Sequence, residues 1–405
     1  MKHAIVCLLV ILSTGLAAQK KCGTDSLMER WANAGPANAR SLASFDSLMA
    51  RFEAGFVHDL QTAREKKRFV IPVVVHILYR TDAQNISDAQ VHSQIEVLNR
   101  DFNWQQTDKD QIPEVWRDLG EPAEIYFQLA DTDPDGNHTN GITRTKVYVE
   151  DIGSTERYYQ SDQGGVDPWP QPHYLNIWVC EIEGNNIGFS YLPAAKMAEA
   201  DGVVIEHIAF GTTGTASHPH DGGRTLVHEV GHYLGLRHTW GSDDESCSST
   251  DYMSDTPWQK GPNYGCKEFP VKSCPGEPNG DMFMNFMDYS NDACALLFTR
   301  RQVEFMRLVL LTNRLALHQS PGITGIDKPV QQSLIGWRWQ PHQNHLVVSN
   351  KLPQPVDLRL IDPSGRWVLA QRINPGEEVI SLDDLSAGFY GLIFGELAGR
   401  IVILK

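Results

Sequence analysis

Three histidines and one glutamate share the stretch His-Glu-Val-Gly-His-Tyr-Leu-Gly-Leu-Arg-His, which starts at His228. On a helix, His228 and His232 project from one face, one turn apart, and can bind one metal ion. Glu229 lies where a carboxylate can take a proton from a water held by that metal. Gly235 allows a sharp turn, after which His238 supplies a third nitrogen. Three neutral imidazoles with an open fourth position are typical of catalytic zinc, whereas structural zinc sites are closed.

The residues around this motif favour a helix with one buried side. Thr225 or Asp221 could cap its start. A pair of histidines four residues apart is more often an ordinary feature of a helix surface, but the complete pattern fixes five positions at once. The sequence therefore predicts a zinc site on a helix whose buried side is formed by Leu226, Val227, Val230 and Leu234.

The complete motif, HExxHxxGxxH, is that of the metzincin metallopeptidases. That clan also has a methionine turn below the metal, and the stretch from Asn285 to Tyr289 is similar to it. The resemblance implies that Met287 forms the hydrophobic floor under the histidines. It also implies that Tyr289 swings towards the zinc and helps to stabilise the oxyanion.

Within the clan, the chain is similar to the pappalysin family, and especially to its small prokaryotic members, from about Val70 to about Leu317. The resemblance implies a zinc endopeptidase that acts on proteins and peptides. Zinc would polarise the scissile carbonyl, and Glu229 would pass a proton from water to the leaving amine. The alternative is a secreted binding protein that keeps zinc as a structural element. Glu229 counts against it, because a closed structural site needs no base.

Composition restricts the class of protein further. At 405 residues, the chain can bury two cores. The net charge of −15 argues against a nucleic-acid partner, because no basic stripe is available to neutralise phosphates. After the first residues, no apolar run approaches the roughly 20 residues that span a bilayer. We expect a monomer without a transmembrane segment.

Residues 1–18 are typical of a signal peptide, which predicts a secreted protein. Lys2 precedes an apolar core at residues 4–12, and small residues lead to Ala18, after which we expect cleavage. A buried first strand is the alternative, but the polar residues 19–21 disfavour it.

Residues 19–68 are polar, rich in alanine and helical in character, and they end in the charged run Arg64-Glu-Lys-Lys-Arg68. Because this run separates a helical leader from the first core strand, we interpret the segment as a pro-segment with an exposed activation site. Cys22-Gly-Thr resembles the cysteine-switch motif of pappalysin pro-segments, which implies that the Cys22 thiolate fills the open position of zinc in a zymogen. Other family members use a pro-segment aspartate instead. A stray thiol or a lipid-modified cysteine is the alternative.

The catalytic domain is expected at residues 69–320. The apolar run Phe69–Tyr79 predicts a strand buried on both faces. Ser87 and Gln90 open a helix that reaches Phe102, and Thr299 with Gln302 forms a capping box for a last helix. Further strands are predicted at 124–130, 174–181 and 203–210.

The strand at 203–210 would be the edge strand that binds the substrate as an added strand. Strands that alternate with helices predict an α/β (α+β) domain with a twisted mixed sheet and an active-site helix. A loop-rich lower half would follow His238, with the cleft between the two halves.

Four cysteines lie in this loop-rich stretch, and in an exported protein an even set indicates two disulfides. The sequence alone permits three pairings, and the family resemblance implies Cys247–Cys274 and Cys266–Cys294. A second zinc site is the alternative, but the close CxxC pair is missing. Cys180, in an apolar strand, is expected to be a buried free thiol.

The same stretch offers hard oxygen ligands for calcium, which related enzymes bind in this region. Asp251, Asp255 and Thr256 are the candidate ligands, and backbone carbonyls could supply the rest. Ordinary solvated acids are the alternative.

Asp292 occupies the position that lines the S1′ pocket in similar enzymes. A buried carboxylate opposite an arginine gives a bidentate, charge-assisted contact. The resemblance therefore implies cleavage on the amino side of Arg or Lys, which would also permit self-activation within Arg64–Arg68. An unselective surface acid is the alternative.

Residues 325–405 change in character, because short alternating segments separated by turn residues replace the helical patterns. They predict a small all-β sandwich. Its motifs, Leu385-Ser-Ala-Gly-Phe-Tyr390 and the closing stretch Arg400–Lys405, resemble the C-terminal sorting domain of type IX secretion. The resemblance implies the type IX machinery as a partner and export across an outer membrane. A carbohydrate-binding or adhesive sandwich is the alternative. The predicted strands are 345–349, 357–361, 367–371, 378–382, 389–394 and 400–404.

Overall fold

The computed structural model describes residues 21–56, 67–195, 198–242, 245–320 and 322–323, and then 335–340, 344–350, 354–362, 366–394 and 397–403. They form two compact units, divided between Thr324 and Gly325. The predicted signal peptide, residues 64–66 of the predicted activation site and the end of the closing stretch lie outside the described residues.

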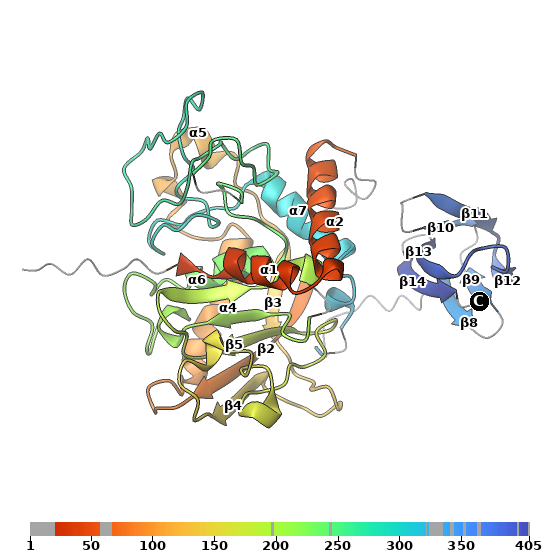
Figure 1. The fold of residues 1–405 in the computed structure, drawn as a ribbon, viewed down its shortest axis with the longest axis horizontal. Coiled ribbons are helices and arrows are strands. Elements are labelled where there is room, and N and C mark those ends of the chain that lie inside the picture. Colours follow the sequence, from red (N-terminus) through yellow and green to blue (C-terminus); the bar gives the residue numbers. More distant parts are fainter. Residues whose placement is uncertain are drawn as a thin grey trace, which may run out of the picture. The chain divides into compact units, whose positions relative to one another are not determined.

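The first unit is built on a seven-stranded mixed sheet (Figure 1). Its order is β1-β6-β7-β5-β2-β3, with β4 paired to β2 beside β3. All pairs are parallel except β6 with β7. The strands are β1 (Lys21–Cys22), β2 (Phe69–Tyr79), β3 (Ile125–Leu129), β4 (Ile142–Lys146), β5 (Leu175–Val179), β6 (Asn186–Ser190) and β7 (Val203–Ile205).

Strand β2 has the predicted bounds and is buried on both faces. Val73, Val75 and Ile77 contribute to the main core, whereas Val74 and Leu78 pack into smaller clusters on the other face. The continuous apolar run therefore indicates a strand that is covered by packed side chains on both faces of the sheet.

Helices cover the main-core face of the sheet, and the caps predicted for two of them are confirmed. In α4 (Asp88–Phe102), the Ser87 side chain accepts a hydrogen bond from the N–H of Gln90. Helix α7 (Arg300–Leu311) begins with the complete capping box of Thr299 and Gln302. The remaining helices of the catalytic part are α5 (Glu114–Arg117) and α6 (Arg224–Tyr233), and α6 carries the histidine motif.

The prediction of the edge strand was wrong. Residues 203–210 form only the three-residue β7, which lies between β5 and β6, followed by a 3₁₀ turn at His207–Ala209. The strand of the catalytic part nearest that edge is β6, which the sequence analysis missed. Its sequence, Asn-Ile-Gly-Phe-Ser, has neither a run of apolar residues nor β-branched enrichment. The apolar residues Val203, Ile205, Ala209 and Phe210 of this stretch instead pack into the main core.

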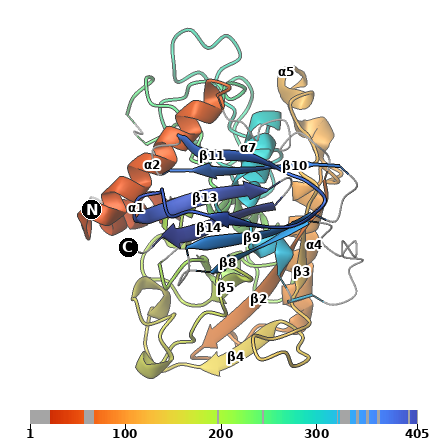
Figure 2. The same ribbon diagram turned by 90° about the vertical axis from the view of Figure 1, so that its right-hand side faces the viewer.

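The predicted pro-segment forms β1, α1 (Thr24–Asn33) and α2 (Pro36–Glu53), drawn in red and orange in Figures 1 and 2. Phe45, Met49 and Phe52 of α2 are buried in the main core. The Arg301 guanidinium of α7 lies 3.9 Å from the centre of the Phe52 ring. The pro-segment is thus packed on the catalytic part as an integral layer.

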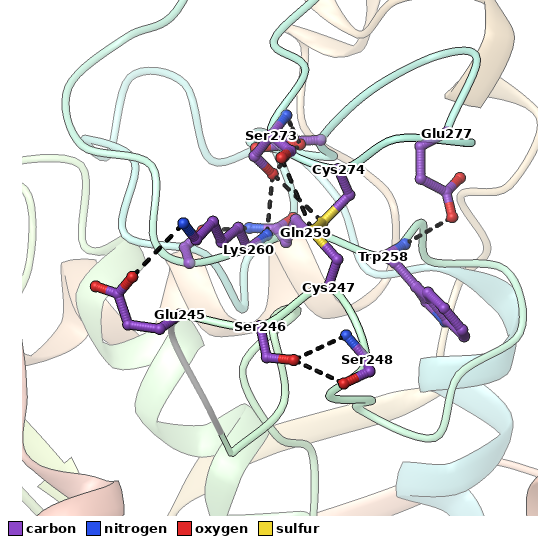
Figure 3. Close-up of a disulfide and its surroundings, with 12 residues drawn as sticks. Glu245, Ser246, Cys247, Ser248, Trp258, Gln259, Lys260, Ser273, Cys274 and Glu277 are labelled. Carbon is purple, nitrogen blue, oxygen red and sulfur yellow. Dashed lines mark hydrogen bonds and ion pairs between the residues drawn. A yellow bond between two sulfur atoms is a disulfide. The ribbon is translucent and has the colours of Figure 1, made fainter.

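Between α6 and α7, the described residues contain no helix or named strand, as predicted for the lower half. In Figure 1, this part lies on the side of α6 away from strands β2 and β4. The disulfides Cys247–Cys274 and Cys266–Cys294 are the two that the family resemblance implied. Figure 3 shows the first, beside a hydrogen bond from the Trp258 N–H to Glu277. Cys180 is a buried free thiol.

The second unit consists of two antiparallel sheets, with orders β11-β10-β13-β14 and β12-β9-β8. Leu346 and Val348 from one sheet share a core with Leu358, Leu360 and Leu392 from the other, as a β-sandwich requires. The six predicted strands are present, and β8 was missed. The bounds are β8 (Ile335–Gln340), β9 (His345–Asn350), β10 (Val356–Ile361), β11 (Trp367–Ile373), β12 (Gly376–Ser381), β13 (Gly388–Phe394) and β14 (Leu397–Ile403).

Across the described residues, no helix has the length and apolar character needed to cross a membrane.

Candidate metal centre

The prediction of the residue that caps the start of helix α6 was wrong. Gly223 is the N-cap residue and no side chain of the helix caps it, so neither Thr225 nor Asp221 has the predicted role. Instead, Asp292 Oδ2 accepts hydrogen bonds from the N–H groups of Gly222 (2.9 Å) and Arg224 (3.0 Å). A carboxylate from a distant loop thus satisfies one free donor in the first turn of the helix and a second just before its N-cap.

The three histidines of the motif converge. His232 Nε2 lies 3.1 Å from His228 Nε2 and 3.1 Å from His238 Nε2. The Nδ1 atoms of His228 and His232 contact the carbonyl oxygens of Phe286 (2.7 Å) and Leu236 (2.8 Å), so each carries its proton there. Burial lowers the pKa of His228 to about 3 and that of His232 well below its usual value, so both rings are neutral.

This donor set fits a metal ion. The Nε2 atoms face one another with lone pairs, and lone pairs so close together need a cation between them. Tetrahedral ligands about 2.0 Å from zinc lie about 3.3 Å apart, near the observed separations. Among the described residues, Cys22 Sγ joins the three histidines in a set of ligand atoms within 4.8 Å of one another.

Gly235 directs the chain from α6 back to His238. Its φ of +100° lies in the left-handed region, and a Cβ there would lie 3.0 Å from the rings of Phe305 and Phe45. The predicted sharp turn is confirmed.

Met287 is fully buried below the histidines. A Cβ at Gly231, on the zinc helix, would lie 2.5 Å from Met287 Sδ, so the glycine lets the methionine approach. Asn285 Oδ1 accepts from the Met287 N–H at 2.9 Å, and the Asn285 amide pairs with Gln302 of the α7 capping box. The methionine turn is thereby tied to the start of α7.

Glu229 is fully buried beside the cluster. Burial raises its pKa to about 8, although hydrogen bonds from Cys22 and Thr24 act in the opposite direction. Those bonds reach Oε2, at 3.5 Å from Cys22 Sγ and 3.4 Å from Thr24 Oγ1. Glu229 Oε1 finds no hydrogen-bond partner among the described residues.

The Tyr289 ring lies beside two of the histidines, with centroids 5.7 Å from His228 and 5.0 Å from His238. Its hydroxyl donates to the Cys22 carbonyl oxygen at 3.3 Å. Tyr289 therefore contacts the pro-segment in this structure.

Three residues at the site were missed by the sequence analysis. Thr24 and Asp25 follow the cysteine in the pro-segment, and Asp25 Oδ2 lies 2.7 Å from His238 Nδ1. The Trp240 ring stacks on His238, with centroids 4.4 Å apart and planes 7° from parallel. The two-residue spacing from His238 to Trp240 was available in the sequence, but nothing there links Asp25 to a ring more than two hundred residues away.

Asp292 lies 3 % exposed in a pocket that it shares with His228, Glu229 and Tyr289. Burial raises its pKa to about 6. The nearby Arg224 guanidinium is already paired with Asp101 at 3.1 Å and Asp108 at 2.8 Å.

The candidate calcium residues are close together but partly committed to other contacts. Asp251 is buried, and its carboxylate accepts from Thr256 Oγ1 at 2.8 Å. Burial raises the pKa of Asp251 to about 8. Asp255 accepts from Thr299 Oγ1 (2.7 Å) and the Arg301 N–H (2.9 Å) at the start of α7.

The mixed sheet, the zinc-motif helix and the methionine turn together define a metzincin-type metallopeptidase. Residues 159–311 match the Peptidase_M43 family model, described as pregnancy-associated plasma protein-A. The chain belongs to this pappalysin family and is a zinc metalloprotease.

Two solved structures and a curated relative illustrate the similarity. Mature mirolysin of Tannerella forsythia, solved with a cleaved peptide, is 45 % identical, with a TM-score of 0.59 over 62 % of this chain and 96 % of its own. A promirolysin mutant from the same organism is 40 % identical, with a TM-score of 0.66 over 74 % and 97 %. Extracellular metalloprotease 1 of Coccidioides posadasii is 29 % identical over 64 % of this chain and 80 % of its own length.

Proposed function

We propose that this chain is the zymogen of a secreted endopeptidase that cleaves proteins on the amino side of Arg or Lys. Zinc would be held by His228, His232 and His238. The observation that carries the proposal is the convergence of three buried Nε2 lone pairs beside Glu229, whose Oε1 has no partner among the described residues. When bound there, zinc supplies Lewis acidity that polarises a peptide carbonyl and acidifies water.

Glu229 is the general base of this proposal, and its carboxylate moves the proton from water to the leaving amine. Its full burial fits this role, because a raised pKa brings a carboxylate closer to the pH at which it must exchange protons. Tyr289 donates a hydrogen bond to the oxyanion once its hydroxyl is released from Cys22.

Asp292 selects a basic side chain after the scissile bond. Its Oδ2 is held by the start of α6, whereas Oδ1 receives a long contact of 3.4 Å from Thr225 Oγ1. Because Arg224 is paired with two other acids, the charge of Asp292 is left for a cationic ligand.

Cys22 keeps the zymogen latent by placing its sulfur at the fourth ligand position. Its Sγ already lies among the histidine nitrogens. Burial and the Glu229 carboxylate raise the pKa of the Cys22 thiol, so the thiolate depends on a cation beside it. β1 also pairs with β6 in parallel and covers the edge that a substrate strand would use.

Activation removes residues 19–68 by cleavage near Arg64–Arg68. The described end of this run, Lys67 and Arg68, is exposed, as a protease site requires. A preference for Arg and Lys would let the enzyme process itself.

Calcium binding by Asp251, Asp255 and Thr256 would order the loop-rich half. The support is the burial of Asp251, since a cation would offset its charge.

The second unit would direct export through the type IX machinery and accompany a cleavable signal peptide. Its support is the two-sheet sandwich together with the sequence motifs at 385–390 and 400–405.

One experiment tests the central proposal. The processed protein is incubated with a peptide library, with and without a chelator, and the fragments are identified by mass spectrometry. Cleavage before Arg and Lys that stops with the chelator and returns with zinc is expected. Cleavage that is indifferent to the chelator would refute the metal site, and cleavage without a basic residue after the bond would refute the specificity.

A further inference from the structure

The three zinc-motif histidines differ in what holds their Nδ1 atoms. His228 and His232 use the carbonyl oxygens of Phe286 and Leu236, which belong to the catalytic part. His238 Nδ1 instead contacts Asp25 Oδ2, at 2.7 Å. The partner of the third histidine therefore comes from the segment that activation would remove.

Asp25 is well placed to orient this ring. It lies in the first turn of α1, immediately after the Cys22-Gly23 stretch, and α1 packs against both β6 and α2. The His238 ring is fully buried and stacked on Trp240. Stacking fixes the plane of the imidazole, but it still permits a half-turn flip about the Cβ–Cγ bond, which would exchange the positions of the ring nitrogens and carbons. The carboxylate removes this freedom by binding Nδ1, so that Nε2 points at the other two histidines.

We infer that Asp25 is a positioning residue for the metal: the pro-segment supplies the carboxylate that holds His238 as a zinc ligand. This inference rests on the zinc site proposed above. A carboxylate that accepts the Nδ1 proton fixes the tautomer, orients the ring and makes the imidazole a stronger ligand. Loss of such a partner typically lowers metal affinity by about 10- to 100-fold.

The pro-segment then acts on the metal in two separate ways. Cys22 adds a ligand atom, whereas Asp25 strengthens a ligand that the catalytic part already has. Excision of the segment removes both contributions, so the zymogen would be the form that acquires and keeps zinc. The processed enzyme would release zinc to a chelator more readily.

The alternative explanation is that Asp25 only anchors the pro-segment. Asp46 offers a matched control, because it is also a pro-segment aspartate and pairs with Arg237, the residue before His238. Asp46→Ala removes this ion pair from the same segment. It leaves the contact with the histidine ring intact.

The test compares Asp25→Ala, Asp25→Glu and Asp46→Ala in the full chain, all carrying Glu229→Gln to prevent self-cleavage. Each protein is loaded with one equivalent of Zn²⁺, and zinc transfer to a chromophoric chelator gives its relative affinity. Circular dichroism and mass spectrometry verify that the fold and the pro-segment are retained. We expect Asp25→Ala to lose about 10- to 100-fold in affinity, Asp46→Ala to match the parent within about twofold, and Asp25→Glu to recover part of the loss.

Equal affinities of Asp25→Ala and the parent would overturn the inference, and so would an equal loss in Asp46→Ala. A parent zymogen that binds no stoichiometric zinc would instead refute the metal site itself. The two failures are therefore distinguishable.

Discussion

Asp292 Oδ2 accepts a hydrogen bond from the backbone N–H of Arg224 at 3.0 Å, which places the proposed specificity residue at the start of the zinc helix. The same carboxylate that would bind a basic side chain also stabilises the helix that carries His228 and His232. Substrate selection and the geometry of the metal site would therefore both depend on the Asp292 side chain. A variant that tests substrate selection must leave the start of the helix intact.

Asp292→Asn separates them, because the amide oxygen can still accept from Gly222 and Arg224 while the negative charge is gone. A hydrogen bond to a charged group contributes about 1.5–3 kcal/mol, or roughly 10- to 100-fold in rate. We therefore expect kcat/KM for a peptide with Arg after the scissile bond to fall by that factor relative to its norleucine analogue. The melting temperature should hardly change.

Asp292→Ala is the comparison variant. It loses the cap as well, so it should cost about 1 kcal/mol of stability in addition. An unchanged ratio of Arg to norleucine cleavage in Asp292→Asn would exclude the carboxylate from substrate selection.

Glu229→Gln should abolish most peptide hydrolysis, because the amide cannot accept the proton of the attacking water. A general base contributes typically 10²- to 10⁴-fold, and kcat/KM should fall by about this amount. The protein is processed with a trace of parent enzyme, which is then removed, and zinc content is measured in parallel. Zinc retained without turnover is the expected pair of results, whereas substantial turnover would refute Glu229 as the base.

The sequence predicted those parts of the site that lie in one contiguous motif. His228, Glu229, His232, Gly235 and His238 need only the helix and one turn to meet, so their spacing carries the geometry. Met287 and the disulfide pairing were accessible only through the family resemblance. Both depend on how a long irregular segment folds back, which periodicity does not encode.

The errors have a common physical cause, since each depends on contacts between distant segments. Strand β6 lacks a local signal, because it is defined by its pairing with β7 and β1. The cap of α6 comes from Asp292, sixty-eight residues beyond Arg224, while the nearby candidates Thr225 and Asp221 look adequate locally. Asp25 and His238 are likewise joined only by tertiary structure.

Calcium should stabilise the fold through Asp251. Its buried carboxylate accepts hydrogen bonds from Thr256 Oγ1 and the Met253 N–H, which are both neutral donors, so a cation there would offset the cost of burial. At a free calcium concentration about 100 times Kd, the gain is about 2.7 kcal/mol. The melting temperature with calcium should exceed that with EGTA, and Asp251→Asn should remove the difference. An equal difference in the variant would refute this choice of ligand.

Cys22→Ser should weaken latency, because a hydroxyl is a far poorer zinc ligand than a thiolate. We expect the uncleaved chain to hydrolyse a short peptide faster and to process itself sooner, with both followed over time by fluorescence and gel. Cys180→Ala is the matched control, since Cys180 is the other free thiol of the described residues and lies in a cluster with Trp178. Unchanged latency in Cys22→Ser, or an equal loss in Cys180→Ala, would contradict the switch.

Acidification should destabilise the sheet through His76. This residue lies fully buried in β2, with Nδ1 2.8 Å from Thr143 Oγ1 and Nε2 3.0 Å from Asn176 Oδ1. Burial lowers its pKa to about 4, from an ordinary value near 6.5. The folded state therefore requires the neutral ring. The corresponding stability is fully present above pH ~6.5 and is lost as the pH falls towards 4, up to about 3 kcal/mol.

His76→Gln keeps hydrogen-bonding groups in β2 but removes the titration. The melting temperature of the parent should fall between pH 7 and pH 4.5, and the fall should be smaller in this variant by several degrees. His92→Gln, at an exposed position of α4, should follow the parent. If His76→Gln and the parent lose equal stability over this range, acid sensitivity arises elsewhere, because a buried neutral ring that must take up a proton cannot leave the pH profile unchanged.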